Sequence, residues 1–251
     1  MVGDLTRGAL TWVGHSTVLI EAGNTRLLTD PVLRSRIGHL RRIVPPPLDS
    51  GLQRLDAVLI SHAHHDHLDL PSLSGLSSSC PVFAPRHSVR LLRRRRLNAC
   101  PLEVGERARV NEVVIIATQA RHSGRRHPLS RGDETLAYLV EGPASVYFAG
   151  DTDVFEEMSE LAGRITVALL PVWGWGSRVG RGHMDPERAA RAAALLEPAV
   201  VVPIHWGTLA SPLAPWVGDP DAPARAFARH VRRLAPQVAV EVLAPGGRIE
   251  L

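Results

Sequence analysis

The stretch Ser61-His62-Ala63-His64-His65-Asp66-His67-Leu68-Asp69 is the most informative part of this 251-residue chain. Four of the six residues from 62 to 67 are histidines and one more is an aspartate. Histidines packed this closely repel one another when protonated, whereas a bound cation favours the neutral ring, which is the form that ligates. The apolar run at residues 57–60 leads directly into the cluster, and active sites of α/β proteins lie at such strand ends. The stretch therefore predicts a metal centre that follows a strand, with ligands suited to zinc, manganese, iron or nickel.

The composition is that of a folded globular protein, with 45% hydrophobic and 22% charged residues. No apolar run approaches the roughly 20 residues of a membrane-spanning helix. The first ten residues lack the charged start and apolar block of a signal peptide, so we expect a cytoplasmic protein without stable membrane insertion. Cys80 and Cys100 show no CxxC spacing, which predicts ordinary thiols rather than a disulfide or a cysteine-bound zinc.

The basic residues give only weak support for a nucleic-acid partner. All 29 of them are arginine, and the formal net charge is +4, which is modest for this length. The arginine block at residues 93–96 falls in an expected helix, where consecutive residues cannot all face one groove. We therefore interpret the block as a solvated face and expect no nucleic-acid partner.

Strand and helix patterns alternate along the chain and favour one layered α/β domain over residues 1–251. Residues 34–52 are expected to form a loop. A helix over 186–196 is expected to begin at a proline, with Asp185 as its N-cap. Strands are expected at residues 10–13, 17–21, 26–29, 82–84, 110–118, 135–141, 145–149, 165–170, 199–203 and 238–243, and further helices at 88–97 and 221–234.

Three more residues of the ligating types follow expected strands. His122 comes shortly after the strand that ends near residue 118, Asp151 follows the strand at 145–149, and His205 follows the strand at 199–203. Each alone is more typical of a polar loop. Together with the cluster at 62–67 they indicate a single constellation at the strand ends.

The chain resembles a known family. Residues 62–67, HAHHDH, match the HxHxDH signature of the metallo-β-lactamase-fold hydrolases, and His122, Asp151 and His205 follow in that family's order. The resemblance implies a four-layer αββα sandwich of two mixed β-sheets flanked by helices, with two metal ions at the sheet edges.

The resemblance also implies a division of the ligands. His65 occupies the variable position of the motif and is not expected to ligate, and Asp30 is expected to hydrogen-bond and orient the histidine-rich loop. The first metal is expected on His62, His64 and His122, the second on Asp66, His67 and His205, with Asp151 bridging the two. Zinc is the expected ion, with manganese or iron as alternatives.

Four further segments resemble one branch of the family. The sequences of residues 12–17, 29–31, 182–189 and 203–208 are similar to those of the N-acyl-phosphatidylethanolamine phospholipase D-like and ascorbate-6-phosphate lactonase-like proteins. In that branch the counterpart of His183 lies near the metals, which implies that His183 contacts a phosphate or polarises the leaving group.

These observations predict a hydrolase that uses a hydroxide shared by two divalent cations, with Asp66, Asp151 and His183 in catalytic roles. The expected substrate is a small molecule, a phosphodiester with a small or lipid-like body. A lactone or other cyclic ester is the alternative, with β-lactam hydrolysis as a promiscuous activity, and a nuclease is disfavoured. A homo-oligomer is compatible with the sequence. Candidate substrate contacts besides His183 are Arg121, Arg125, Trp173 and Trp175.

Overall fold

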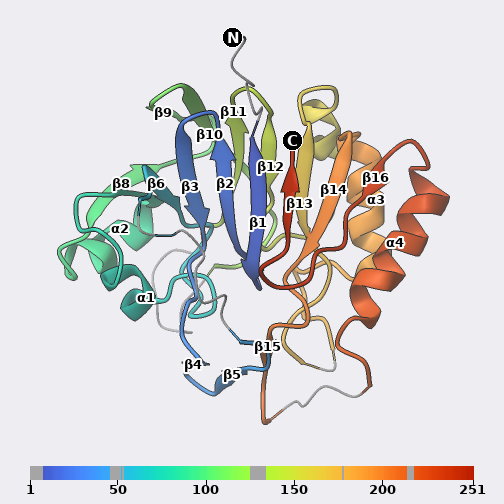
Figure 1. The fold of residues 1–251 in the computed structure, drawn as a ribbon, viewed down its shortest axis with the longest axis horizontal. Helices are drawn as coiled ribbons and strands as arrows, with labels where there is room; N and C mark the ends of the chain where they lie inside the picture. The colour runs from blue at the N-terminus through green and yellow to red at the C-terminus, as the bar shows by residue number, and fades with distance from the viewer. Residues whose placement is uncertain (1–7, 46–51, 53, 125–133, 177, 214–217) are drawn as a thin grey trace, which may run out of the picture.

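Two seven-stranded β-sheets face each other in the computed structural model of the chain (Figure 1). The structure describes residues 8–45, 52, 54–124, 134–176, 178–213 and 218–251. The first sheet has the order β17 (Arg248–Glu250), β1 (Ala9–Gly14), β2 (Thr17–Ala22), β3 (Thr25–Thr29), β6 (Ala57–Leu59), β7 (Pro81–Pro85) and β8 (Asn98–Leu102). The second has the order β16 (Ala239–Val240), β14 (Val200–Ile204), β13 (Val167–Pro171), β12 (Val146–Phe148), β11 (Leu136–Glu141), β10 (Val113–Gln119) and β9 (Arg107–Val110). A small third sheet joins β15 (Leu209–Ala210), β5 (Leu40–Arg42) and β4 (Arg36–Ile37).

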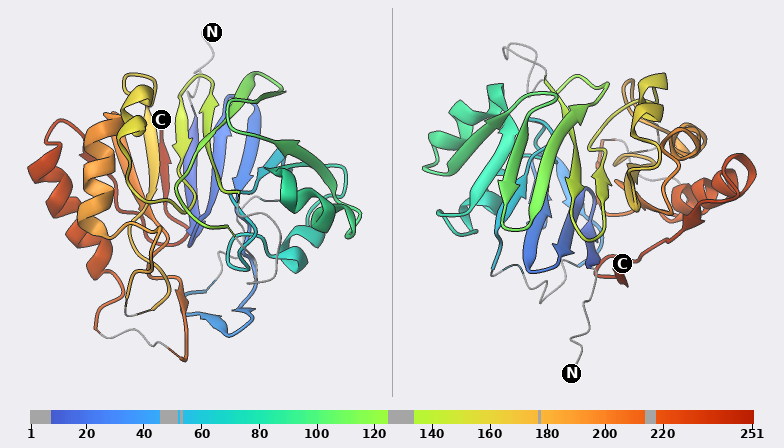
Figure 2. Two further views of the ribbon diagram at one scale, coloured as in Figure 1. Left: turned by 180° about the vertical axis from the view of Figure 1, so that it is seen from behind. Right: turned by 90° about the horizontal axis from the view of Figure 1, so that it is seen from above.

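Helices flank the sheets on both outer sides (Figure 2). Helix α2 (Arg86–Arg93) packs on β7 and β8, beside the short α1 (Leu70–Ser74). Helix α3 (Pro186–Leu196) packs on β13, with α4 (Ala222–Leu234) and the 3₁₀ helix η1 (Glu156–Leu161) against it. The layers confirm the predicted α/β fold, a four-layer αββα sandwich. Within the described residues, no helix has both the length and the apolar character to cross a bilayer.

The apolar run before the histidine cluster is buried on both faces, because the residues of α1 and α2 cover one face of β6 and the second sheet covers the other. Side chains alternate between the faces of a strand. Val58 packs with Val82 and the residues of α1 and α2, whereas Leu59 and Phe83 belong to the large core between the two sheets. A strand buried on both faces shows continuous hydrophobicity instead of alternation.

The strand directions bring six strand ends to one edge of the sandwich. In the first sheet β1, β3 and β6 run the same way. In the second sheet β10, β12 and β14 likewise run parallel to one another. The third sheet lies below the lower ends of the two large sheets in the view of Figure 1. Segments distant in sequence therefore deliver their following residues to one place.

Several predicted boundaries were wrong. The expected loop at 34–52 contains β4 and β5. The strand expected at 110–118 is present as β10 but begins three residues later, after a turn at Asn111, whose φ is 48°, that joins it to β9. The helix expected at 88–97 is α2, which begins and ends earlier. At the C-terminus β16 has only two residues, and the strand that closes the first sheet is β17, paired with β1. Cys80 and Cys100 are free thiols, as predicted.

The predicted N-cap of α3 is confirmed, and it carries a prediction about stability. The Asp185 side chain accepts a hydrogen bond from the Arg188 amide at 2.8 Å, and Pro186 follows at the first position of the helix. We expect Asp185→Ala to lower the free energy of unfolding by about 1 kcal/mol, because a helix amide loses its acceptor. Urea denaturation measures this. Asp185→Asn retains an acceptor oxygen, so equal losses in both variants would contradict the capping role.

Candidate metal centre

Every residue predicted as a ligand from the sequence reaches this common edge. Their donor atoms form close groups in which all atoms lie within 4.8 Å of one another. One group consists of His62, His64, His122 and Asp151, and another of His15, Asp66, His67 and His205. A third, overlapping group joins Asp30 to His62 and His67.

The first group is arranged around His64. The Nδ1 atom of His64 lies 2.9 Å from Nε2 of His62 and 3.2 Å from Nε2 of His122. His62 is buried, and the other two rings are half-buried. Three imidazole nitrogens that face one another at these distances have the spacing of neighbouring ligands on one ion.

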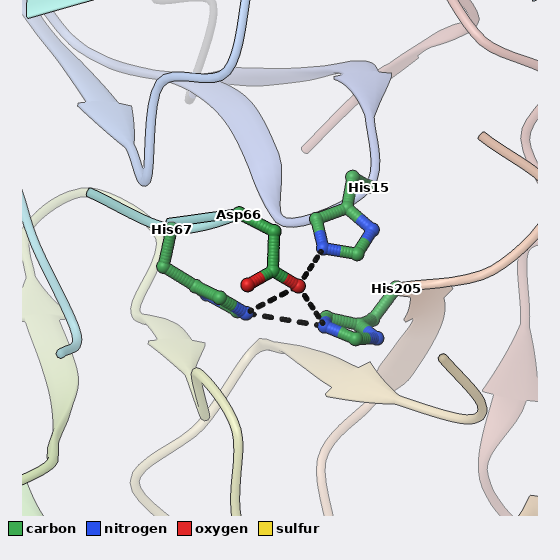
Figure 3. A group of neighbouring side chains, drawn as sticks. All are labelled: His15, Asp66, His67 and His205. Atoms are coloured by element: carbon green, nitrogen blue, oxygen red, sulfur yellow. Dashed lines mark hydrogen bonds and ion pairs between the residues drawn. The ribbon is translucent and has the colours of Figure 1, made fainter. Parts of the chain in front are cut away.

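The second group contains a residue that the sequence analysis did not identify (Figure 3). The Nε2 atoms of His67 and His205 lie 3.1 Å apart, and each lies within 4 Å of Asp66 Oδ2. Nε2 of His15 lies 3.1 Å from the same oxygen. His15 directly follows β1, so it carries the same strand-end signal that identified His122, Asp151 and His205.

Asp151 lies between the two groups. Its Oδ2 atom is 3.1 Å from His67 Nε2 and 3.8 Å from His62 Nε2, while Oδ1 is 3.2 Å from His205 Nε2. Oδ1 is fully buried, and no described residue donates a hydrogen bond to it. A buried carboxylate oxygen without a donor is costly unless a cation satisfies it. The donor set thus fits divalent cations, with Asp151 next to both groups.

Asp30 holds the histidine-rich loop from below. Its carboxylate accepts hydrogen bonds from the Ser61 amide at 2.7 Å and the Ser61 hydroxyl at 2.6 Å, and Oδ2 lies 2.7 Å from His67 Nδ1. The Thr17 hydroxyl in turn donates to the Asp30 carbonyl at 2.7 Å. A carboxylate on the outer nitrogen fixes the orientation of an imidazole and leaves its other nitrogen for a metal.

Three residues of this edge have left-handed backbone conformations. The φ angles are 54° for His15, 31° for Asp30 and 63° for His205, and each residue follows the last residue of a strand. Such conformations are unfavourable for non-glycine residues and persist where the surroundings impose them. The turn away from the strand path at these positions coincides with the side chains that gather at the site.

Burial and mutual charge set the protonation of the cluster. Burial lowers the pKa of His62 and His205 well below the ordinary value and that of His122 to about 4, so these rings are neutral near pH 7. Burial alone would raise the pKa of Asp66, but His67 and His15 hold it well below its usual range. Burial likewise opposes ionisation of Asp151, while His205 and His67 lower its pKa further than burial raises it. Neutral imidazoles around ionised carboxylates are the ligating forms of both side chains.

A cavity of about 460 Å³ opens over the two groups. His64, Asp66 and Asp151 form one part of its lining, with His65 and His183 beside them. The rest of the lining comes from Trp175 and from the β4–β5 hairpin. The hairpin contributes Ile37, Gly38, His39 and Leu40. Ile37 and Leu40 belong to a small separate core against which Trp175 packs. The cavity therefore combines a polar floor with an apolar wall.

His183 lines the cavity next to Asp151. Its Nε2 atom is 3.1 Å from Asp151 Oδ2, while Nδ1 lies 3.1 Å from the Arg181 carbonyl. Burial lowers its pKa, but the Asp151 carboxylate raises it more, so the pKa of His183 is above the ordinary value. The side chain remains 23% exposed.

The other predicted substrate contacts have different outcomes. Trp175 lines the cavity. Trp173 is not among the described residues of the lining: its ring packs on the main core, its indole donates to the Gly176 carbonyl, and its own carbonyl lies 3.0 Å from His205 Nδ1. Arg121 also lies outside that lining, with both Glu157 oxygens 2.9 Å from its guanidinium, which covers the Phe155 ring. Arg125 lies outside the described residues.

Comparison with known proteins agrees with this geometry. The family model described as "Beta-lactamase superfamily domain" matches residues 25–206. A metal-dependent hydrolase from Rubrobacter xylanophilus is 32% identical, over 98% of this chain and 98% of that protein. An uncharacterized protein from Mycobacterium tuberculosis is 33% identical, over 99% of this chain and 70% of that protein. Among solved structures, a metallo hydrolase from Ignicoccus hospitalis superimposes with a TM-score of 0.75 at 26% identity, covering 97% of this chain and 98% of that one.

Proposed function

The chain belongs to the beta-lactamase superfamily and is a metal-dependent hydrolase of the metallo-β-lactamase fold, and from this premise we propose that it cleaves phosphodiester bonds in a small or lipid-like substrate. The observation that carries the proposal is the cavity above the two donor groups. Its described lining holds three imidazoles that belong to neither group, His39, His65 and His183, and no carboxylate except Asp66 and Asp151. An anionic diester fits this lining better than a cationic or neutral substrate.

We assign two divalent cations to the site, with zinc expected ahead of manganese or iron. His62, His64 and His122 would hold the first, and Asp66, His67 and His205 the second. The contacts of Asp151 with rings of both groups support its role as the bridge. Bound there, such cations would lower the pKa of water toward about 7 and polarise the scissile group.

The side chains around the cations would orient and protonate. Asp66 and Asp151 have ionised carboxylates at the cavity floor and are positioned to orient the attacking water. His183 lines the cavity next to Asp151 and would protonate or polarise the oxygen of the leaving group. The apolar wall of Ile37, Leu40 and Trp175 would hold a hydrophobic part of the substrate and exclude water.

A substrate panel tests the reaction class. We expect turnover of bis(p-nitrophenyl) phosphate by the metal-loaded protein, and little opening of simple lactones. If the protein opens lactones readily and turns over little bis(p-nitrophenyl) phosphate, it is a lactonase, which is the alternative that the sequence leaves open. Turnover of neither class would contradict the proposal, provided that elemental analysis finds the ions bound.

The role of His183 is tested by the leaving group. We expect His183→Gln to affect a diester with an alkyl leaving group about tenfold more than one with a p-nitrophenyl group, because a poor leaving group depends on general acid catalysis. The measurement is kcat for the two substrates in each protein. Equal losses for both substrates would assign His183 to binding instead of proton transfer.

The apolar wall predicts a change in KM. For a diester with an apolar substituent, we expect Trp175→Ala to raise KM about fivefold with kcat little changed, because one lost aromatic contact is worth about 1 kcal/mol. Trp175→Phe retains an aromatic ring and is the matched control. A dimethyl phosphodiester, which lacks the apolar substituent, should show no difference among the three proteins.

A further inference from the structure

His15 lies in the second donor group but differs from the other rings there (Figure 3). It is buried, its ring centroid is 3.9 Å from that of His205, and its Nε2 atom is 3.1 Å from Asp66 Oδ2. Two interpretations fit these distances. His15 is either another ligand or a donor that holds Asp66 in place.

The outer nitrogen of each ring separates the two interpretations. A histidine that ligates a metal usually donates its other N–H to an oxygen. Four of the five histidines proposed as ligands have Nδ1 next to an oxygen, and the fifth, His64, faces the site with Nδ1 itself. The oxygens are Ser61 Oγ for His62 at 2.9 Å, Asp30 Oδ2 for His67 at 2.7 Å, the Gly182 carbonyl for His122 at 2.9 Å and the Trp173 carbonyl for His205 at 3.0 Å. When these four rings ligate a cation, the oxygen places the proton on Nδ1 and the lone pair of Nε2 faces the site.

His15 has the opposite arrangement. Its Nδ1 atom is buried and has no hydrogen-bond partner among the described residues. A proton on Nδ1 would leave a buried N–H unsatisfied and would turn the Nε2 lone pair toward a carboxylate oxygen, and both are unfavourable. The proton therefore belongs on Nε2, where it is donated to Asp66 Oδ2. A protonated nitrogen cannot ligate.

The backbone of His15 is fixed in the position that this hydrogen bond requires. Its amide donates to the Thr208 hydroxyl at 2.8 Å, and its carbonyl accepts from the Trp12 indole and from the His205 amide, both at 2.9 Å. The ring of Trp12 stacks on that of Trp206. The turn after β1 in the first sheet is thereby attached to the segment after β14 in the second sheet, which carries a proposed ligand.

We propose that His15 is a positioning residue, whose Nε2–H donates to Asp66 Oδ2 and holds this carboxylate against His67 and His205 for the second cation. The inference rests on the proposed two-cation site. It assigns a role to a residue that does not ligate. His15 contacts one proposed ligand, Asp66, by a hydrogen bond and a second, His205, by a tilted ring contact.

Cobalt(II) titration of the chelated protein tests the proposal without any substrate. The amide nitrogen of glutamine corresponds to Nε2 of histidine and that of asparagine to Nδ1, so His15→Gln can reach Asp66 and His15→Asn cannot. Asparagine also tolerates the left-handed backbone at this position. We expect the wild type and His15→Gln to bind two cobalt ions by visible absorption, and His15→Asn to bind the second about 10- to 100-fold more weakly with the first unchanged.

Two outcomes would overturn the inference in distinguishable ways. If the wild type binds two ions and His15→Asn binds both with unchanged affinity, or if His15→Gln is as weak as His15→Asn, His15 does not position Asp66. If the wild type binds a single ion, the two-cation site itself is wrong and the role of His15 falls with it.

Discussion

Asp151→Ala should lose most of the bound metal and lower turnover by at least about 100-fold, because its carboxylate contacts rings of both donor groups. Removal of the carboxylate leaves His62, His67 and His205 without the nearest negative charge that they share. Asp66 is then the one carboxylate left among the proposed ligands of the two cations. Elemental analysis of the purified variant and its kcat on the best substrate of the panel measure the two effects.

Asp153→Ala is the matched control for this variant. It removes a carboxylate from the same loop, but that carboxylate binds the Val154 amide and Arg188 instead of the histidines. We expect Asp153→Ala to retain both metal and turnover. An Asp151→Ala protein that keeps both ions and full activity would refute the bridging role.

The candidate ligands were predictable because two independent signals coincide at them. Ligating residue types stand close together at 62–67, and the remaining ones follow apolar strands, whose parallel directions collect their ends at one edge. A strand such as β14 is recognisable from local hydrophobicity alone. The position in space of the residue that follows it depends on the topology of the whole sheet.

His15 carries the same strand-end signal as His122, Asp151 and His205, and this signal was not applied to it. It is a single histidine after the six-residue strand β1, and nothing in the local sequence shows which side chain it faces. Its function depends on the contacts with Asp66 and with Thr208, which lie 51 and 193 residues away in sequence. Contacts of this kind follow from tertiary structure and leave no periodic pattern.

The apolar wall of the cavity was missed for a different reason. The segment at 34–52 was expected to be a loop, stiffened by the three prolines at residues 45–47. The β4–β5 hairpin forms nevertheless, since Ile37 and Leu40 bury themselves with Val32 and Leu209 in a core of their own. Tertiary burial overrides weak local preference in short strands. The strand β17 was missed because its partner, β1, lies at the other end of the chain.

Removal of the metal should abolish turnover and lower the melting temperature together. Cations that bind the folded state and not the unfolded chain stabilise the protein by about 2.7 kcal/mol at 100 times their Kd. For a protein of this size that free energy corresponds to a shift of roughly 5–10 °C for each ion. Chelation leaves Asp66 and Asp151 ionised and buried among histidines. Burial lowers the pKa of His67, but the surrounding carboxylates raise it more, so its pKa is well above the ordinary value.

The test combines differential scanning calorimetry with reconstitution by zinc, manganese or iron, after elemental analysis of the freshly purified protein. The ion found in that analysis should restore both the melting temperature and turnover. Asp151→Ala supplies the control, since its melting temperature should respond little to the chelator. A chelated wild type with unchanged stability and activity would mean that the buried histidines and carboxylates satisfy one another without a cation. Two observations argue against this: imidazole nitrogens of the site face one another at 2.9–3.2 Å, and Asp151 Oδ1 has no donor among the described residues.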